Sequence, residues 1–192
     1  MNWISFCLLI FVLFGCKENS SFSNSNSKDI DYQQLGTDIV LQSQSAILSK
    51  LSIAIQEQGL KGALEYCSAN VSNIIDSLSK VHQCKIRRTS LKLRNTANSP
   101  RNDDEIMILQ QFRENYLQNK VTEGRLVERD GKPVFYKPII VMMNTCLKCH
   151  GKPKIDISSE VENKILELYP NDQAMNYELN DFRGMWVIEF EK

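Results

Sequence analysis

The residues with the clearest chemical potential in this chain are Cys146, Cys149 and His150, which form the pattern C-x-x-C-H. Two cysteines at this spacing place their sulfurs on one side of a helical turn, where both can add to the vinyl groups of one porphyrin as thioethers. The adjacent imidazole can then bind the iron as proximal ligand. The pattern therefore predicts one covalently attached c-type haem.

Two other interpretations of the same cysteines are weaker. A zinc half-site needs about four ligands in all, and the sequence contains no second C-x-x-C and no H-x-x-H. A dithiol redox pair is expected near a βαβ pattern, which the sequence does not show. Haem is favoured over both.

The first residues predict where the chain is sent. Residues 3–14 are a largely apolar run, which is shorter than the roughly 20 residues that span a bilayer but suits the core of a signal peptide. The run ends in Leu13-Phe14-Gly15-Cys16, which resembles a bacterial lipoprotein signal cut just before a lipidated cysteine. An uncleaved anchor is the alternative. Both interpretations predict an extracytoplasmic, membrane-anchored, periplasm-facing protein.

Composition divides the rest of the chain. With residues 1–15 as signal peptide, the Ser/Asn-rich stretch 16–32 reads as lipidated Cys16 and a flexible tether, and residues 33–192 suit one domain. The chain carries 23 basic and 23 acidic residues, and no basic stripe or nucleic-acid motif argues for DNA or RNA. The expected partners are the membrane, through the lipid, and a redox or signalling protein.

The elements that must position the motif follow from periodicity. Apolar residues at helical spacing predict helices over 33–58 and 60–81, interrupted near Gly59, with Cys67 in the middle of the second apolar face. Asn102, with Glu105 three residues later, predicts a helix start. The remaining expected elements are strands over 85–93, 125–130, 134–143 and 185–190, and a short helix over 161–169. Helices followed by hairpin-forming strands predict an α+β fold with an antiparallel sheet.

The segment IRRTSLKLRNTANSP, residues 86–100, resembles the signature of a periplasmic c-type-haem sensor-like family long filed as a domain of unknown function. The resemblance continues through the C-x-x-C-H motif, residues 169–174 and residues 181–184, and so covers roughly residues 33–190. It implies a PAS-like sheet with N-terminal helices. The family has glycine where this chain has Asn176 and Asn180, and asparagine tolerates the left-handed conformation well enough to keep those turns.

The second axial position on the iron is the open chemical question. The resemblance implies Cys67 as the ligand, although a free cysteine on an apolar stripe is more often a small core residue. His82, near a helix end, is the rival and is expected to face solvent. One of Met142 and Met143 is expected on the core face. The other methionines, expected in the core or in turns, are Met107, Met175 and Met185.

Two arginines after the second helix are candidates for the acidic groups of a haem. A buried haem brings two propionates, and arginine binds carboxylates through two parallel hydrogen bonds. At least one of Arg88 and Arg94 is therefore expected to contact a propionate or to hold a structural carboxylate such as Glu105.

Three functional classes remain. A redox- or gas-responsive sensor module with His150 and Cys67 as axial ligands is favoured, and an electron-transfer c-type cytochrome is the alternative. An enzyme such as a peroxidase is disfavoured, because acid–base catalysis on an open haem face wants a further histidine or similar group there and none is evident.

Overall fold

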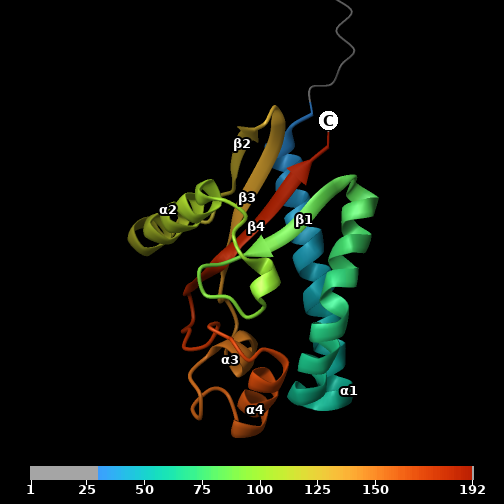
Figure 1. The fold of residues 1–192 in the computed structure, drawn as a ribbon, viewed down its shortest axis with the longest axis vertical. Coiled ribbons are helices and arrows are strands. Elements are labelled where there is room, and N and C mark those ends of the chain that lie inside the picture. Colours follow the sequence, from blue (N-terminus) through green and yellow to red (C-terminus); the bar gives the residue numbers. More distant parts are fainter. Residues whose placement is uncertain (1–29, 192) are drawn as a thin grey trace, which may run out of the picture.

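The structure, a computed structural model, describes residues 30–191. The expected signal peptide and the lipidated Cys16 lie outside the described residues. Figure 1 shows a sheet with a helical hairpin along one side and two short helices gathered at one end. Among the described helices, none has the length and apolar character needed to cross a membrane.

The long N-terminal element, α1 (Tyr32–His82), is a helical hairpin whose two halves lie side by side (Figure 1). The turn occurs at Gly59, where φ is 68° and ψ is −177°, a conformation that glycine adopts without steric cost. The Asp31 side chain caps the first half by accepting hydrogen bonds from the backbone N–H groups of Gln33 and Gln34, both at 3.0 Å. The prediction of two helices broken near Gly59 is confirmed.

Four antiparallel strands follow in the spatial order β1-β4-β3-β2. Their bounds are β1 (Cys84–Thr89), β2 (Arg125–Arg129), β3 (Lys132–Ile140) and β4 (Phe182–Phe190). The last strand along the chain, β4, therefore lies between β1 and β3. The predicted α+β class, with N-terminal helices packed on an antiparallel sheet, is confirmed.

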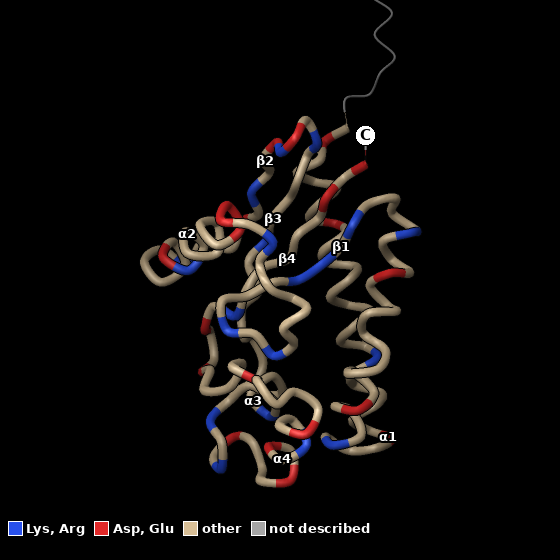
Figure 2. The backbone as a smooth tube through the Cα atoms, in the orientation of Figure 1, with Lys and Arg blue, Asp and Glu red and all other residues tan. Residues whose placement is uncertain are grey.

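Helices cover both faces of the sheet, and the alternation of side chains along each strand decides which residue faces which helix. On β4, Trp186 and Ile188 pack against α1, whereas Met185 and Val187 pack against α2 (Asp103–Asn119). Asn102 caps α2 by accepting from the backbone N–H of Glu105 at 3.0 Å, which confirms the predicted helix start. Figure 2 shows basic residues concentrated along β1.

The other elements lie beyond the sheet. A 3-10 turn, η1 (Thr96–Asn98), follows β1. The two short helices, α3 (Asn144–His150) and α4 (Ser159–Leu168), sit at one end of the sheet beside the turn of α1 (Figure 1). Asn176 and Asn180 have φ values of 62° and 66°, so the asparagines adopt the left-handed conformation that was expected of them.

Three strand ends differ from the predictions by three residues or more. β1 stops at Thr89 and not at residue 93, because the Ser90 hydroxyl accepts from the Lys92 backbone N–H at 3.1 Å and donates to the Arg183 carbonyl at 2.7 Å. β3 stops at Ile140 after a shift of register, so residues 141–143 lead into α3. β4 begins at Phe182, three residues earlier than expected.

Candidate functional site

The C-x-x-C-H motif, residues 146–150, makes up the last five residues of α3. Cys146 and Cys149 are free thiols. Cys149 packs on an apolar cluster that includes Leu64 of α1 and Ile165 of α4, while Cys146 packs against a second cluster. Gly151 ends the helix, and a Cβ there would lie 2.5 Å from the Cβ of Asp156, so this position has no room for a side chain. Both thiols thus lie on a short helix that packs against α4.

The imidazole of His150 is fixed in one tautomer. Its Nδ1 lies 2.8 Å from the carbonyl oxygen of Ala174. Because a carbonyl only accepts, Nδ1 carries the proton and Nε2 keeps its lone pair. Burial holds the pKa of His150 well below its usual value, and the charges of Arg94 and Arg183 lower it further. A neutral imidazole with Nδ1 tied to the backbone is the form in which histidine binds a metal through Nε2.

Cys67 is brought to the same site from the second half of α1. It is half-buried and close enough to Cys149 for a charge on one sulfur to raise the pKa of the other. Burial raises the pKa of the Cys67 thiol, and the nearby guanidinium of Arg88 opposes that rise. Cys67 on α1 and Cys149 on α3 therefore lie near each other.

The other candidate iron ligands, His82 and the methionines before α3, are either far from Cys67 or exposed to solvent. His82 ends α1, 15 residues after Cys67, which places it about 22 Å away along the helix axis. The expectation that His82 faces solvent is wrong, because its Nε2 is buried without a partner among the described residues. Met142 and Met143 are 70% and 43% exposed, so neither lies on the core face.

The remaining methionines divide between core and surface. Met185 is fully buried beneath α2, and Met175 packs on the cluster that holds Cys149. Met107 is 49% exposed, so its placement in the core or a turn was wrong. It lies on the outer side of α2, where helical periodicity leaves positions for solvent.

The Arg94 guanidinium is engaged in hydrogen bonds with other residues of the protein. Its Nε and Nη2 each donate to a different carboxylate oxygen of Asp172 at 3.2 Å, and Nη2 also donates to the Cys149 carbonyl at 2.6 Å. The Asp172 side chain has no exposed surface. Arg94 therefore holds a structural carboxylate.

The expected partner of that kind, Glu105, is held by other residues. Glu105 is buried and accepts from Arg87, from Arg129 at 3.4 Å and from the backbone N–H of Arg101 at 2.9 Å. Arg87 and Arg88 point to opposite faces of β1 because they are adjacent on a strand. Glu105 sits on the α2 face and is held by neither Arg88 nor Arg94. The expectation that one of these two arginines holds a structural carboxylate is nevertheless met, because Arg94 holds Asp172.

Arg88 and Arg183 differ from the other buried cations. The Arg88 guanidinium lies over the Trp186 ring, 5.5 Å from its centroid, and makes no side-chain hydrogen bond or ion pair with another described residue. Arg183 donates to the Ser90 hydroxyl and to the Lys92 carbonyl, both at 2.9 Å. It forms no ion pair among residues 30–191, although Asp172 is near enough for its charge to raise the pKa of Arg183. Burial lowers the pKa of each guanidinium.

The indole N–H of Trp186 is a further unused donor. Trp186 is opposite Arg88 in the β1–β4 register, and its Nε1 is buried without an acceptor in the described part of the chain. Two cations without carboxylates and one free N–H donor fit a ligand that brings acidic groups of its own. The sequence singled out Arg88 but missed Arg183 and Asp172. Both residues lie in segments of the family resemblance, Asp172 in residues 169–174 and Arg183 in residues 181–184, and that resemblance was the signal that could have found them.

Two alternatives for the cysteines gain no support. Within residues 30–191 there is no group of three or more His, Cys, Asp or Glu residues arranged to hold a metal ion by themselves. The named strands of the described chain pair only antiparallel, whereas a thioredoxin-like pair is expected near a βαβ unit.

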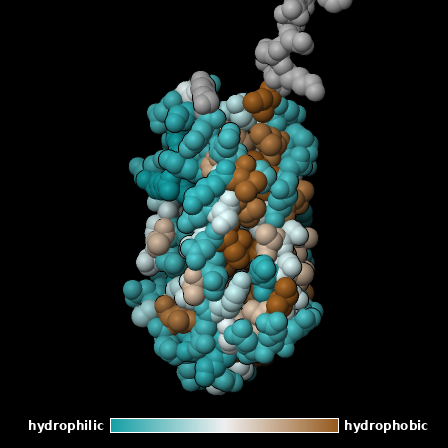
Figure 3. All heavy atoms as spheres, turned by 90° about the vertical axis from the view of Figure 1, so that its right-hand side faces the viewer, coloured by the Kyte–Doolittle hydropathy of each residue, from teal (hydrophilic) through white to brown (hydrophobic). Residues whose placement is uncertain are grey.

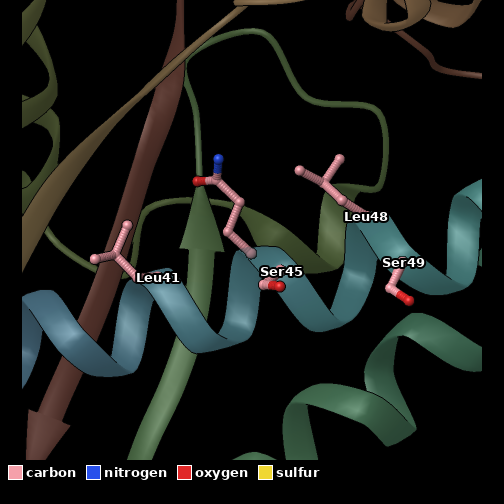
Figure 4. Close-up of a pocket in the computed structure, with 5 residues that line it drawn as sticks. Leu41, Ser45, Leu48 and Ser49 are labelled. Carbon is pink, nitrogen blue, oxygen red and sulfur yellow. The ribbon is translucent and has the colours of Figure 1, made fainter.

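A surface groove on α1 is separate from this site. Its lining residues all come from the first half of the helix and lie along one side of it (Figure 4): Leu41, Gln44, Ser45, Leu48 and Ser49. The α1 side of the molecule shows a band of apolar residues between hydrophilic ones (Figure 3). No cysteine or histidine lines the groove.

The fold and the site together define an α+β domain in which a helical hairpin and a C-x-x-C-H helix enclose one end of an antiparallel sheet. The chain belongs to the Tll0287-like family, whose sequence model matches residues 23–190. Its fold is similar to the crystal structure of the cyanobacterial haem protein Tll0287, with a TM-score of 0.63 and 22% identity over 85% of this chain and 98% of that chain. Among curated proteins, none matches the chain.

Proposed function

We propose that this chain is a c-type haem protein with one haem joined to Cys146 and Cys149 and with His150 as an iron ligand. The observation that carries the proposal is the state of His150. Its Nδ1–H donates a hydrogen bond to the Ala174 carbonyl at 2.8 Å, which leaves the Nε2 lone pair available to bind a metal. Two free thiols on the same helix supply the attachment points. Membership of a family named after a haem protein supports the same cofactor.

Cys67 is the second axial ligand in this proposal. It comes from the second half of α1 and is near Cys149 and Arg88. Arg88 and Arg183 are the partners of the haem propionates, because both are partly buried cations without a carboxylate of their own among the described residues. Arg88 agrees with the sequence-based expectation, and Arg183 is added by the geometry.

The proposed role is that of a redox- or gas-responsive sensor. A bound haem supplies an iron that holds an anionic sulfur more firmly when oxidised than when reduced. The buried surroundings of Cys67 raise the pKa of its thiol, so once the sulfur is released it takes up a proton readily. The second half of α1 then loses its link to α3. A coupling of a few kcal/mol between ligation and helix position is enough to move a two-state equilibrium.

The test is the variant Cys67→Ala, with Cys84→Ala as matched control. Cys84 is also buried, but in the core between α1 and the sheet, and burial raises the pKa of its thiol to about 11. Cys67→Ala should change the ferric optical spectrum and EPR g-values, raise the reduction potential and leave covalent attachment intact. Cys84→Ala should change none of these. An unchanged spectrum and potential in Cys67→Ala would reduce Cys67 to a packing residue.

Electron transfer is the second candidate, and the surface position of α3 favours it. Lys148 is exposed and the two cysteines beside it are only half-buried, so a haem edge would lie close to a docking partner. The two functions differ in the behaviour of Cys67: an electron carrier keeps both axial ligands in both oxidation states. Binding of CO or NO to the reduced protein therefore supports the sensor, and its absence supports the carrier.

A further inference from the structure

The Ala174 carbonyl, which accepts the hydrogen bond from His150, belongs to a segment without helix or strand, residues 169–181, between α4 and β4. A backbone carbonyl in such a segment keeps its position only if other contacts hold it. Asp172 provides one of them, because its Oδ1 accepts from the backbone N–H of Ala174 at 3.0 Å. The position of the Ala174 peptide thus depends on a buried carboxylate two residues earlier.

Arg94 holds that carboxylate and reaches the histidine helix at the same time. Its guanidinium donates to both oxygens of Asp172 at 3.2 Å, to the carbonyl of Cys149 at 2.6 Å and to the carbonyl of Ala174 at 3.4 Å. One planar group therefore joins the residue before His150 to the peptide that accepts from its ring. No other described arginine or lysine touches both segments.

We propose that Arg94 and Asp172 are positioning residues that hold the Ala174 carbonyl against Nδ1 of His150 and so fix the direction of Nε2. The inference rests on the proposed role of His150 as an iron ligand. Groups that hydrogen-bond a ligating histidine fix its ring and its tautomer and raise its basicity. Here the acceptor is a main-chain carbonyl in a loop. Backbone hydrogen bonds from Gln173 to Leu93 at 2.7 Å and from Tyr177 to His150 at 2.9 Å hold the two flanks of this loop, and Arg94 and Asp172 contact Ala174 itself.

Charge explains why a pair is needed. Asp172 is buried, and a carboxylate taken out of water without a cation is strongly disfavoured. Arg94 supplies the cation in a fork that matches both oxygens, which a lysine cannot reproduce. Arg94→Lys keeps the charge but loses the simultaneous bonds to Asp172 and Cys149. Asp172→Asn keeps the shape but removes the anion.

The experiment follows the ring proton of His150 by NMR in the protein as isolated, together with its covalent haem content. In Arg94→Gln and Asp172→Asn the exchange of the Nδ1 proton with solvent should accelerate by about tenfold, the factor given by the net free energy of one hydrogen bond. Arg94→Lys should show a smaller acceleration. In the Cys67→Ala background, the ferrous iron–histidine stretch should fall in frequency in the same order.

Arg129→Gln is the control, because it removes a comparable guanidinium from the Glu105 cluster on the α2 face. It should leave the exchange and the stretch unchanged. If the Arg94 and Asp172 variants exchange no faster than this control, Arg94 and Asp172 are only structural and the inference is overturned. The ring proton can be followed with or without iron, whereas absence of covalent haem from the parent protein would overturn the proposed function alone.

Discussion

Cys146 and Cys149 are equivalent in the motif but not in their surroundings. Burial raises the pKa of the Cys149 thiol, and the charge of Arg94 only partly opposes that rise. The rise makes the thiolate of Cys149 harder to form in the folded chain. If thioether bonds form at both sulfurs, the site must be reached in a form in which Cys149 is more open than it is here.

Covalent attachment gives the first prediction. Protein made with a haem-c maturation system should retain one haem per chain after acid–acetone extraction, because thioether bonds survive this treatment. The double variant Cys146→Ala, Cys149→Ala should release any haem that it binds, whereas Cys84→Ala should retain it as the parent does. Zinc without iron in natively produced protein would contradict the assignment.

Arg88 and Arg183, the two arginines without an ion pair among the described residues, give the second prediction. Replacing Arg88 or Arg183 by glutamine removes a positive charge near the proposed propionates, which favours the oxidised iron and lowers the reduction potential. At about 10 Å and an effective dielectric constant of about 20, one charge is worth roughly 1.7 kcal/mol, or about 70 mV. Potentiometry measures this, with Arg113→Gln on the exposed side of α2 as control. Equal potentials in all three variants would place the propionates elsewhere.

Some of these roles could be predicted from the sequence and others could not. The C-x-x-C-H motif is local, so its chemistry follows from spacing alone. Arg94 and Asp172 are 78 positions apart, and the residues around each of them do not indicate that the two side chains form a pair. Likewise, alternation along a strand says that Arg87 and Arg88 face opposite sides, but only the packing of α2 decides which of them meets Glu105.

The elements α2 and β1 are joined by a charge cluster, and this gives the third prediction. Burial raises the pKa of Glu105, but hydrogen bonds from Arg87, from the Arg101 N–H and from Arg129 outweigh it, so the net pKa lies below the usual value. Glu105→Gln removes the anion and leaves buried cations, which should lower the free energy of unfolding by about 3 kcal/mol. Urea denaturation at neutral pH measures the loss.

The pH dependence of that cluster has a definite sign. A carboxylate with a lowered pKa in the folded state stabilises the fold above its unfolded pKa of about 4.3, and this contribution disappears as the pH falls through the folded value. The stability gap between parent and Glu105→Gln should therefore be constant near pH 7 and shrink below about pH 4. A gap that is the same at pH 7 and pH 3 would show that Glu105 does not act through its charge.

At the scale of elements, the helices were easier to predict than the strand ends. The break in α1 was visible because Gly59 interrupts two stripes of helical period. The end of β1 depends on the hydroxyl of Ser90 bonding to Arg183, 93 residues away, and the end of β3 depends on a shift of register against β4. Both are set by pairing across the sheet, which no local pattern records.

For the molecule as a whole, the fourth prediction concerns its anchor. Residues 13–16 predict that the mature chain begins at a lipidated Cys16, and two acyl chains would hold it firmly at a membrane. Membrane fractions should contain the protein with an intact mass that includes the lipid, and Cys16→Ala should lack the modification. An unmodified chain that still begins at Met1 would contradict the lipoprotein signal.

The place of β4 in the sheet has a consequence for the order in which the molecule is made. A chain delivered from its N-terminus exposes Cys146 and Cys149 before β4, and without β4 neither β1 nor β3 has its inner neighbour. The sheet therefore closes only after both thiols have emerged. If thioether bonds form as proposed, the machinery that makes them would meet those thiols while the domain is still incomplete, and pairing of the last strand would then fix the position of the modified helix.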